Sequence, residues 1–326
     1  MKTIEVEDAL NLDAVFADTR TPKEFEEATI PGAVNIPLFS NEERAVVGTI
    51  YKKIGKNEAI EKGMEFVSKH LPNMLKEFNK YKGKKIVIFC WRGGMRSRSI
   101  TALLDSLGFD VYQMKGGHKE FRRYVLRTLE NYKLTSKLIV LNGLAGSGKT
   151  EILNKFKNSI DLEGLAQHRN SLLGAVGLKP RSQKMFDALL LKRLEELKNE
   201  KYIFIEGEGR KIGNVILPLF LYNGMKKGIN VLIERDINKR AERLVKEYGS
   251  HKEELIKLLD KFNKLTSNKN ILLLKKLLNE NKLQESALIF LKEYYDKKYS
   301  CSREKYKIAI KENYAENLSK LIKKLE

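Results

Sequence analysis

Residues 138–150 read LIVLNGLAGSGKT, an apolar run that passes directly into a glycine-rich segment. The second part is a complete Walker A pattern, G-x-x-x-x-G-K-[ST], whose backbone N–H groups wrap a phosphate. Its lysine supplies a positive charge, and its threonine hydroxyl can hold Mg²⁺. An apolar strand precedes the pattern and a helix is predicted over residues 151–158, so we expect a phosphate-binding loop. The predicted phosphate-binding residues are Gly143, Gly146, Ser147, Gly148, Lys149 and Thr150.

A carboxylate at the end of a neighbouring strand usually accompanies such a loop and holds metal-bound water. A strand is predicted over residues 202–205, and the segment EGEGR that follows it offers Glu206 or Glu208 for this position. The candidate substrate-binding residues in this half of the chain are Glu163, His168, Arg169, Glu206, Glu208 and Arg210. The alternative for each of them is a solvated surface charge.

Residues 85–97, KIVIFCWRGGMRS, form the second informative stretch. A buried strand is predicted to deliver Cys90 to its carboxyl end, two glycines allow a tight loop, and a helix is predicted to begin near Arg96. The inward-pointing N–H groups of such a loop and the positive end of the helix favour the reactive thiolate over the thiol. Arg92 and Arg96 could pair with an oxyanion brought to that thiolate. We therefore predict that Cys90, Arg92 and Arg96 are catalytic, with an inert core cysteine as the alternative.

Short apolar runs alternate with helical patterns along much of the chain, which predicts parallel sheets covered by helices. A new series of strands begins after Lys133, so we expect two α/β domains, residues 1–133 and 134–326. From Ala241 onward the pattern is helical and rich in lysine and leucine, and Arg240 and Arg243 near its start are candidates for closing over phosphates. Strands are predicted at residues 15–17, 33–36, 86–89, 138–141, 202–205 and 230–233, and the clearest helices at 96–107 and 118–132.

The composition excludes several classes of protein. The chain has 326 residues, of which 42% are hydrophobic, enough for two domains that each bury a core. No apolar run approaches the length of a membrane span, and the N-terminus lacks the apolar region of a signal peptide. The two cysteines give neither a disulfide framework nor a cysteine-based zinc site. We therefore expect a cytoplasmic protein with no membrane partner and no metal centre built from its own side chains.

The positive charge is concentrated in the second half of the chain. The whole chain carries +20, and residues 1–133, with 23 Lys+Arg and 18 Asp+Glu, contribute +5 of it. The remaining 39 Lys+Arg and 24 Asp+Glu contribute +15, which favours a polyanionic partner such as nucleic acid. A solvated helix surface is the alternative. We predict structural or surface positions for His70, His118 and His251, and Cys301 could resolve an adduct on Cys90 unless it is a bystander.

Residues 1–133 resemble a rhodanese domain. The resemblance rests on ADTR at residues 17–20, IPGAVNIP at 30–37 and VYQMKGG at 111–117. It implies that Cys90 carries sulfur as a persulfide, or the selenium analogue, and it makes Asp18 and Arg20 candidate substrate-binding residues. Five residues separate Cys90 from Arg96, one more than in the usual sulfurtransferase loop. This larger loop is similar to that of the cysteine phosphatases of the same fold, so a phosphate-sized or selenium-bearing ligand is expected.

The order of the two halves and several further segments resemble the tRNA 2-selenouridine synthase family. These segments are CWRGGMRS, GLAGSGKT, DLEGLAQHR, EGEGRKIG and LVKEYG, with another similarity at residues 294–296. The resemblance implies a rhodanese-like parallel-sheet domain followed by a P-loop NTPase-like α/β domain with a basic helical tail. It also implies a two-step reaction on the wobble 2-thiouridine of tRNA, first geranylation by geranyl diphosphate and then replacement of the geranylthio group by selenium from selenophosphate.

The partners implied by this resemblance are tRNA, geranyl diphosphate and selenophosphate, with selenophosphate synthetase as a candidate supplier of the last. No tightly bound cofactor is expected, and Mg²⁺ or ATP is a possible additional ligand. An ATP-dependent sulfurtransferase acting on tRNA is the alternative, in which Cys90 donates sulfur to an activated acceptor. A basic RNA-binding protein without catalysis is a third interpretation, against which the two complete loops argue.

Overall fold

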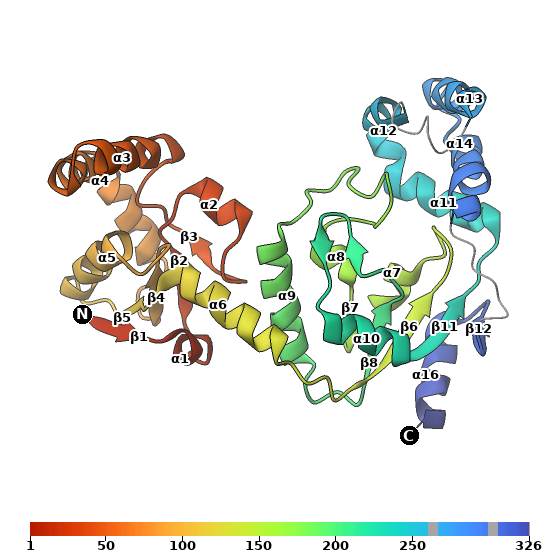
Figure 1. Ribbon diagram of the computed structural model, residues 1–326, viewed down its shortest axis with the longest axis horizontal. Helices are drawn as coiled ribbons and strands as arrows, with labels where there is room; N and C mark the ends of the chain where they lie inside the picture. The colour runs from red at the N-terminus through yellow and green to blue at the C-terminus, as the bar shows by residue number, and fades with distance from the viewer. Residues whose placement is uncertain (260–266, 299–305, 326) are drawn as a thin grey trace. The chain divides into compact units, whose positions relative to one another are not determined.

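The computed structural model describes residues 1–259, 267–298 and 306–325. The chain divides into two compact units (Figure 1). Unit 1 comprises Met1–Asn131 and Lys184–Lys192, and unit 2 comprises Tyr132–Gln183 and Arg193–Glu326. Each unit contains its own five-stranded sheet.

The sheet of unit 1 has the strand order β1-β5-β4-β2-β3, and all its neighbouring strands are parallel. Its strands are β1 (Lys2–Ile4), β2 (Val15–Asp18), β3 (Val34–Asn35), β4 (Ile86–Phe89) and β5 (Val111–Met114). The central strand β4 reads IVIF and is buried throughout, as expected for a parallel strand covered on both faces. Its C-terminus therefore delivers the following residue, Cys90, to the edge of the sheet where parallel α/β proteins bind ligands.

The helices of unit 1 begin where the sequence provides caps. Thr21 with Glu24, and Ser40 with Glu43, form capping boxes that satisfy backbone N–H groups at two helix starts. The helices are α1 (Val6–Leu10), α2 (Pro22–Glu27), α3 (Asn41–Lys53), α4 (Lys56–Asn79), α5 (Met95–Ser106) and α6 (Gly117–Glu130). Along α6 the apolar residues recur every four positions, so the helix buries one face.

The sheet of unit 2 has the order β12-β11-β6-β8-β7 and is also parallel throughout. Its strands are β6 (Lys137–Asn142), β7 (Ser159–Ile160), β8 (Tyr202–Glu206), β11 (Ile229–Ile233) and β12 (Ile308–Ile310). A separate hairpin pairs β9 (Lys211–Ile212) with β10 (Val215–Ile216). The two parallel sheets confirm the predicted α/β fold class.

Ten α-helices belong wholly or partly to unit 2 within the described residues. They are α7 (Lys149–Leu153), α8 (Leu162–Ala166), α9 (Gln183–Glu196, of which 184–192 group with unit 1), α10 (Leu219–Lys227), α11 (Ile237–Tyr248), α12 (Lys252–Leu259), α13 (Asn268–Asn279), α14 (Leu283–Phe290), α15 (Asp296–Lys298) and α16 (Tyr314–Leu325). A 3₁₀ turn at Gly249–His251 follows α11, and a π-helical turn at Leu291–Tyr295 joins α14 to α15.

The prediction that the chain is helical from Ala241 onward is wrong at Ile308–Ile310. These residues form β12, which pairs with Val231–Ile233 at the edge of the sheet. Leu318 of α16 is buried in the same core as Phe204 of β8, so the C-terminal segment completes this unit. A three-residue strand is too short to produce an alternating pattern, which is why the sequence did not reveal it. Cys301 lies outside the described residues.

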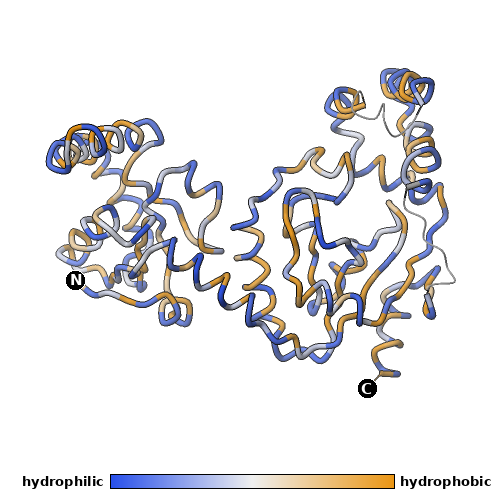
Figure 2. Tube along the Cα trace, viewed as in Figure 1, coloured by the Kyte–Doolittle hydropathy of each residue, from blue (hydrophilic) through white to orange (hydrophobic). Residues whose placement is uncertain are grey.

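Helices α11 to α14 and the π-helical turn pack around a second core in unit 2. Its members include Leu244, Leu255, Leu278 and Phe290. Hydrophobic and hydrophilic residues alternate along these helices, as amphipathic packing requires (Figure 2). Among the helices described, none is both long and apolar enough to cross a membrane.

Candidate active sites

The glycine-rich loop of unit 2 connects β6 to α7, as the sequence predicts. Gly143, Gly146 and Gly148 all have positive φ angles, of 155°, 74° and 89°. A Cβ atom on Gly146 would lie 2.8 Å from the carbonyl oxygen of Arg240, so the loop cannot accept a side chain there without moving. The Lys149 ammonium donates a hydrogen bond to the Gly143 carbonyl at 2.9 Å, which places the lysine charge at the loop.

Glu206 at the end of β8 is the carboxylate that accompanies this loop. It is fully buried, and its side chain accepts hydrogen bonds from the Thr150 hydroxyl at 2.7 Å and from the backbone N–H of Glu163 at 3.1 Å. Burial raises the pKa of Glu206 to about 8, helped by the negative charges of Asp161 and Glu208. Burial and the charge of Glu206 likewise raise the pKa of Glu163 to about 9.

These raised pKa values predict that the free protein loses stability as the pH rises. Both carboxyls bind a proton in the folded state up to about pH 8–9, whereas the ordinary glutamate pKa is 4.5. Between these values the folded state binds more protons than the unfolded state, so the free energy of unfolding falls with rising pH and levels off above about pH 9. Glu206→Gln, which carries no titrating proton, is expected to flatten this dependence in thermal melting measured from pH 5 to 9.

The matched control is Glu280→Gln, because Glu280 is an exposed residue whose pKa is lowered by its hydrogen bond with Lys282. This variant should keep the slope of the parent chain above pH 5. Equal slopes for Glu206→Gln and the parent would contradict the assignment.

Arg240 holds the phosphate loop in place through a hydrogen bond to the loop backbone. The prediction that it closes over the phosphates is therefore corrected. Its side chain is 4% exposed, and its Nε donates to the carbonyl oxygen of Ala145 at 2.8 Å. Its two terminal nitrogens donate to the carboxylate of Asp296 at 3.0 and 2.6 Å, a bidentate arrangement that fixes the guanidinium plane. Arg243, the other candidate, pairs with Glu151.

Loss of this support is expected to weaken phosphate binding. Arg240→Ala removes a buried guanidinium and leaves the partly exposed Asp296 carboxylate and the Ala145 carbonyl without their donor, which should cost about 1–3 kcal/mol. Asp296→Asn keeps the shape and one hydrogen bond, so it should cost less. The measurements are thermal melting and the dissociation constant of inorganic diphosphate, with Lys297→Ala as the control because Lys297 only pairs with Glu293 at the surface. An Arg240→Ala protein with parental affinity and stability would show that the contact is dispensable.

A cavity of about 290 Å³ opens beside the loop, and we call it the P-loop cavity. Of the predicted residues, those that line it are Gly146, Gly148, Lys149, Thr150, Glu163, Arg169 and Arg243. Its lining also includes Tyr248 and Tyr295, which were not predicted from the sequence. Tyr248 lies under the Arg169 guanidinium, 4.9 Å from it. The sequence signal that could have identified these tyrosines is the similarity of LVKEYG and YYD to segments of a known family.

The other candidates of unit 2 lie outside the lining of this cavity. Glu208 accepts a hydrogen bond from Asn170 at 2.6 Å, which leaves Glu206 as the carboxylate next to Thr150. His168 packs against the backbone of Gly174 and Gly213, and burial lowers its pKa. Arg210 is exposed on the loop after β8. Gly143 and Ser147 belong to the phosphate loop but do not line the cavity, and Ser147 is buried.

Cys90 of unit 1 lies at the end of β4 in a loop that is held from two sides. Its thiol is 3% exposed and accepts a hydrogen bond from the Ser97 hydroxyl at 3.3 Å. Its carbonyl oxygen accepts from the backbone N–H of His118 at 2.8 Å. Gly117 has a φ angle of 60°, and a Cβ atom there would overlap the Cys90 carbonyl, so only glycine allows the two turns to approach this closely.

The predicted cations of unit 1 differ in their surroundings. Arg96 pairs with Glu24 at 2.9 Å, and Arg92 is exposed. Arg20 is buried and makes hydrogen bonds to both carboxylate oxygens of Asp18. Asp18 is completely buried, so the prediction that it binds substrate directly is corrected: it holds Arg20 in position.

A second cavity, of about 300 Å³, lies beside this loop, and we call it the cysteine-loop cavity. Its lining carries a net positive charge, because Arg20, Arg44, Arg96 and Lys184 outnumber Glu24 and Glu27. Trp91 and His118 contribute rings stacked 5.7 Å apart. Burial and the charge of Arg20 lower the pKa of His118 to about 3, so this histidine is a neutral member of the wall and not a surface residue. A thiol next to a cationic cavity is suited to chemistry on a phosphate-sized anion.

Two family models match the chain. A rhodanese-like domain matches residues 3–124, and the tRNA 2-selenouridine synthase AAA domain matches residues 136–273. The first confirms the rhodanese-like assignment of the N-terminal half, and the second agrees with the phosphate-loop half.

Curated relatives named tRNA 2-selenouridine synthase align with most of the chain. The one from Pseudomonas fluorescens is 32% identical over 331 residues, which cover 90% of this chain and 89% of the relative. Those from Nitrosomonas europaea and Shewanella piezotolerans are 32% and 34% identical, each over 72% of this chain. The chain spans 64% and 66% of the length of these two relatives.

A solved N-terminal domain from Clostridium difficile 630 is 50% identical to this chain. The match covers 38% of this chain and 99% of that domain, with a TM-score of 0.37.

Proposed function

The chain belongs to the tRNA 2-selenouridine synthase family, and from this membership we propose that it is a transferase that replaces the sulfur of tRNA 2-thiouridine by selenium. The observation that carries the proposal is the presence in one chain of two preorganised loops of different chemistry. One offers a phosphate-binding lysine, Lys149, and the other a thiol, Cys90, beside a cationic cavity. A two-step exchange needs both.

In the first step, the sulfur of 2-thiouridine attacks C1 of geranyl diphosphate. A C–S bond forms, the C–O bond to the diphosphate breaks, and the diphosphate leaves with the electron pair of that bond, while the base loses its N3 proton to solvent. Lys149 and the N–H groups of the loop are positioned to stabilise that charge as it develops. The lining of the P-loop cavity also includes Leu178, Leu244 and Tyr248, which suits a ligand with an apolar part.

Magnesium fits this site as a companion of the diphosphate. In the described parts of the chain, no three His, Cys, Asp or Glu side chains are grouped to hold a metal ion by themselves. The Thr150 hydroxyl and the Glu206 carboxyl are hard oxygen donors next to the loop. They would hold a Mg²⁺ that the diphosphate brings, and the ion would displace the proton that Glu206 binds in the free protein. Such an ion would supply additional positive charge to the leaving group.

In the second step, selenium from selenophosphate replaces the geranylthio group at C2 of the base. We place Cys90 as the nucleophile that starts this exchange: its thiolate attacks C2, a C–S bond to the cysteine forms, and geranylthiolate leaves. Selenium then attacks C2 and expels the Cys90 thiolate, and hydrolysis of the Se–P bond releases phosphate, so no oxidant is needed. Arg20 and Arg96 line the cavity that would hold the phosphate part of the selenium donor.

The partner tRNA is consistent with the charge of the chain. The net charge is +20, and the part after Lys133 contributes +15 of it. Neutralising backbone phosphates with such a surface releases counterions, so we expect the affinity for tRNA to fall steeply as the salt concentration rises.

Nucleoside analysis tests the proposal against its alternatives. The full chain is incubated with tRNA containing 2-thiouridine, geranyl diphosphate and selenophosphate, and the tRNA is then digested and analysed by mass. We expect geranylthiouridine without selenophosphate and selenouridine with it. A parallel incubation uses tRNA with unmodified uridine, ATP and a sulfur donor. Formation of 2-thiouridine that requires ATP there would support the ATP-dependent sulfurtransferase instead. Retention of tRNA without any new nucleoside would leave only RNA binding.

A further inference from the structure

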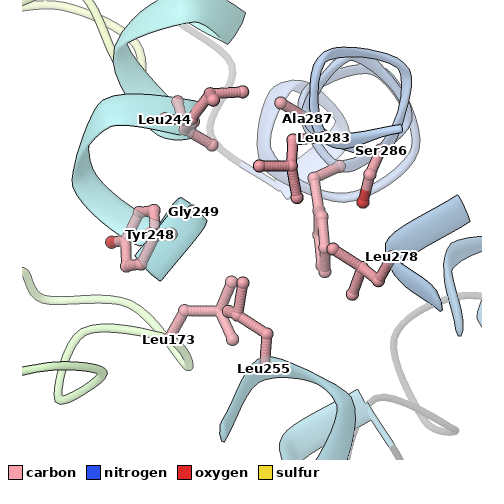
Figure 3. A pocket seen from close by; sticks show the side chains of 11 residues that line it. Leu173, Leu244, Tyr248, Gly249, Leu255, Leu278, Leu283, Ser286 and Ala287 are labelled. Atoms are coloured by element: carbon pink, nitrogen blue, oxygen red, sulfur yellow. The ribbon is translucent and has the colours of Figure 1, made fainter. Parts of the chain in front are cut away.

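A second, smaller cavity of unit 2 lies among helices α11, α12, α13 and α14 (Figure 3), and we call it the apolar cavity. Side chains from all four helices and from the loop at Leu173 converge on it. Its lining consists of Leu173, Leu244, Val245, Tyr248, Gly249, Leu255, Leu278, Leu283, Ser286, Ala287 and Phe290. None of these residues carries a charge, so the cavity is unsuited to a phosphate or a metal ion.

The apolar cavity adjoins the P-loop cavity. Leu244 and Tyr248, both on α11, line the two cavities, so one face of this helix separates a phosphate-binding space from an apolar one. Gly146 of the phosphate loop contacts the same helix, because a Cβ atom on it would lie 2.7 Å from Leu244 Cδ1. A ligand with an anionic head and an apolar tail would be served by this arrangement.

The polar groups of the apolar cavity do not match a nucleobase. The Ser286 hydroxyl is buried and has no hydrogen-bond partner within the described residues. The Tyr248 hydroxyl points away from the other lining side chains (Figure 3). An adenine ring placed here would leave most of its ring nitrogens and its amino group without partners, which costs free energy for every buried polar atom.

The size of the apolar cavity suits the end of a chain. Its volume is about 30 Å³, room for about two groups of the size of a water molecule. An isoprenoid chain ends in two methyl groups on one carbon. The rest of such a chain would pass along Leu244 and Tyr248 toward the phosphate loop.

We infer that the apolar cavity receives the two terminal methyl groups of a prenyl diphosphate whose diphosphate lies on the phosphate loop. This inference rests on the proposed function and adds to it the part of the protein that selects the length of the donor. Ala287 and Leu283 of α14 line the cavity, so the sizes of these two side chains should set how long a prenyl chain the protein accepts.

The test measures the affinity of the full chain for inorganic diphosphate, dimethylallyl diphosphate and geranyl diphosphate. We expect the parent chain to bind geranyl diphosphate at least about tenfold more tightly than dimethylallyl diphosphate, because the second isoprene unit buries apolar surface. Ala287→Leu, which fills the cavity, should remove this preference and leave the affinity for inorganic diphosphate within about twofold. Leu283→Ala, which enlarges the cavity, should shift the preference toward the fifteen-carbon farnesyl diphosphate.

Two further variants serve as controls. Leu272→Ala changes an exposed leucine of α13 that does not line the cavity, and it should alter no affinity. Ser286→Ala should leave the affinity for geranyl diphosphate unchanged or increased, because the prenyl chain offers no hydrogen bond to the serine hydroxyl. A loss of ATP affinity in Ser286→Ala, with ATP bound more tightly than geranyl diphosphate, would assign the cavity to a nucleotide and overturn the inference.

The outcomes separate this inference from the proposed function. If the parent chain binds geranyl diphosphate no more tightly than inorganic diphosphate, the donor in the proposed function is wrong. If the parent protein prefers geranyl diphosphate and both Ala287→Leu and Leu283→Ala keep the parental preference for donor length, the proposed function stands. The apolar cavity is then not the binding site of the prenyl group.

Discussion

Lys149→Ala should abolish geranylation of tRNA, with a loss in rate of at least about 100-fold. The lysine charge lies at the loop and would pair with a diphosphate whose negative charge increases as it leaves. Two measurements check this: the rate at which geranylthiouridine forms, and the dissociation constant for inorganic diphosphate. Selenation of tRNA that has already been geranylated should proceed at the parental rate, because that step does not use the phosphate loop.

The matched control is Lys155→Ala, which removes an exposed lysine that follows the same helix and does not line the P-loop cavity. It should geranylate normally. If Lys149→Ala retains the parental affinity for geranyl diphosphate, the phosphate loop does not serve the geranyl donor.

Cys90→Ala is expected to block the second step of the reaction, selenation, and to leave the first step, geranylation, intact. This protein should still produce geranylthiouridine, since the phosphate loop is intact, but selenouridine should fall by about 1,000-fold or more if the thiol forms the covalent intermediate with the base. Removing one small buried group costs about 1–2 kcal/mol, so the variant should remain folded in thermal melting. Intact-mass analysis of the parent chain after incubation with geranylated tRNA, without selenophosphate, should detect a tRNA adduct on Cys90.

Cys301→Ala provides the control for the second cysteine of the chain and should selenate normally. Full selenation by Cys90→Ala would remove the covalent role of the thiol. Full selenation by Cys90→Ala together with an adduct on Cys301 would transfer that role to the other cysteine.

The parts of these sites that the sequence revealed are those that local pattern determines. A buried run followed by glycines marks both β4 with Cys90 and β6 with the phosphate loop, because each motif fits within about a dozen residues. A carboxylate at the end of β8, either Glu206 or Glu208, followed from a more general rule, since the carboxyl ends of neighbouring parallel strands meet at one edge of a sheet. The structure places Glu206 next to the loop, where it accepts a hydrogen bond from Thr150, 56 positions away in the chain.

The features that the sequence concealed depend on distant partners and on burial. Nothing in the residues around Arg240 indicates that its partner is Asp296, 56 positions away, and an isolated arginine near a phosphate loop resembles a ligand. Asp18 was a candidate binding residue because residues 17–20 resemble a rhodanese motif, but the structure buries it completely, with hydrogen bonds from Arg20 and Thr29. Burial of a charged side chain depends on which elements cover it, and the linear pattern does not contain that information.

The position of Asp296 bears on how such genes can recombine. The family model of the phosphate-loop half ends at residue 273, but Tyr295, Asp296 and strand β12 lie beyond that limit. A crossover between two related genes at this limit would join a phosphate loop from one parent to a cavity wall, a supporting carboxylate and an edge strand from the other. The two segments depend on each other's contacts, so hybrids joined at residue 273 should lose activity unless both parents supply matching residues at these positions.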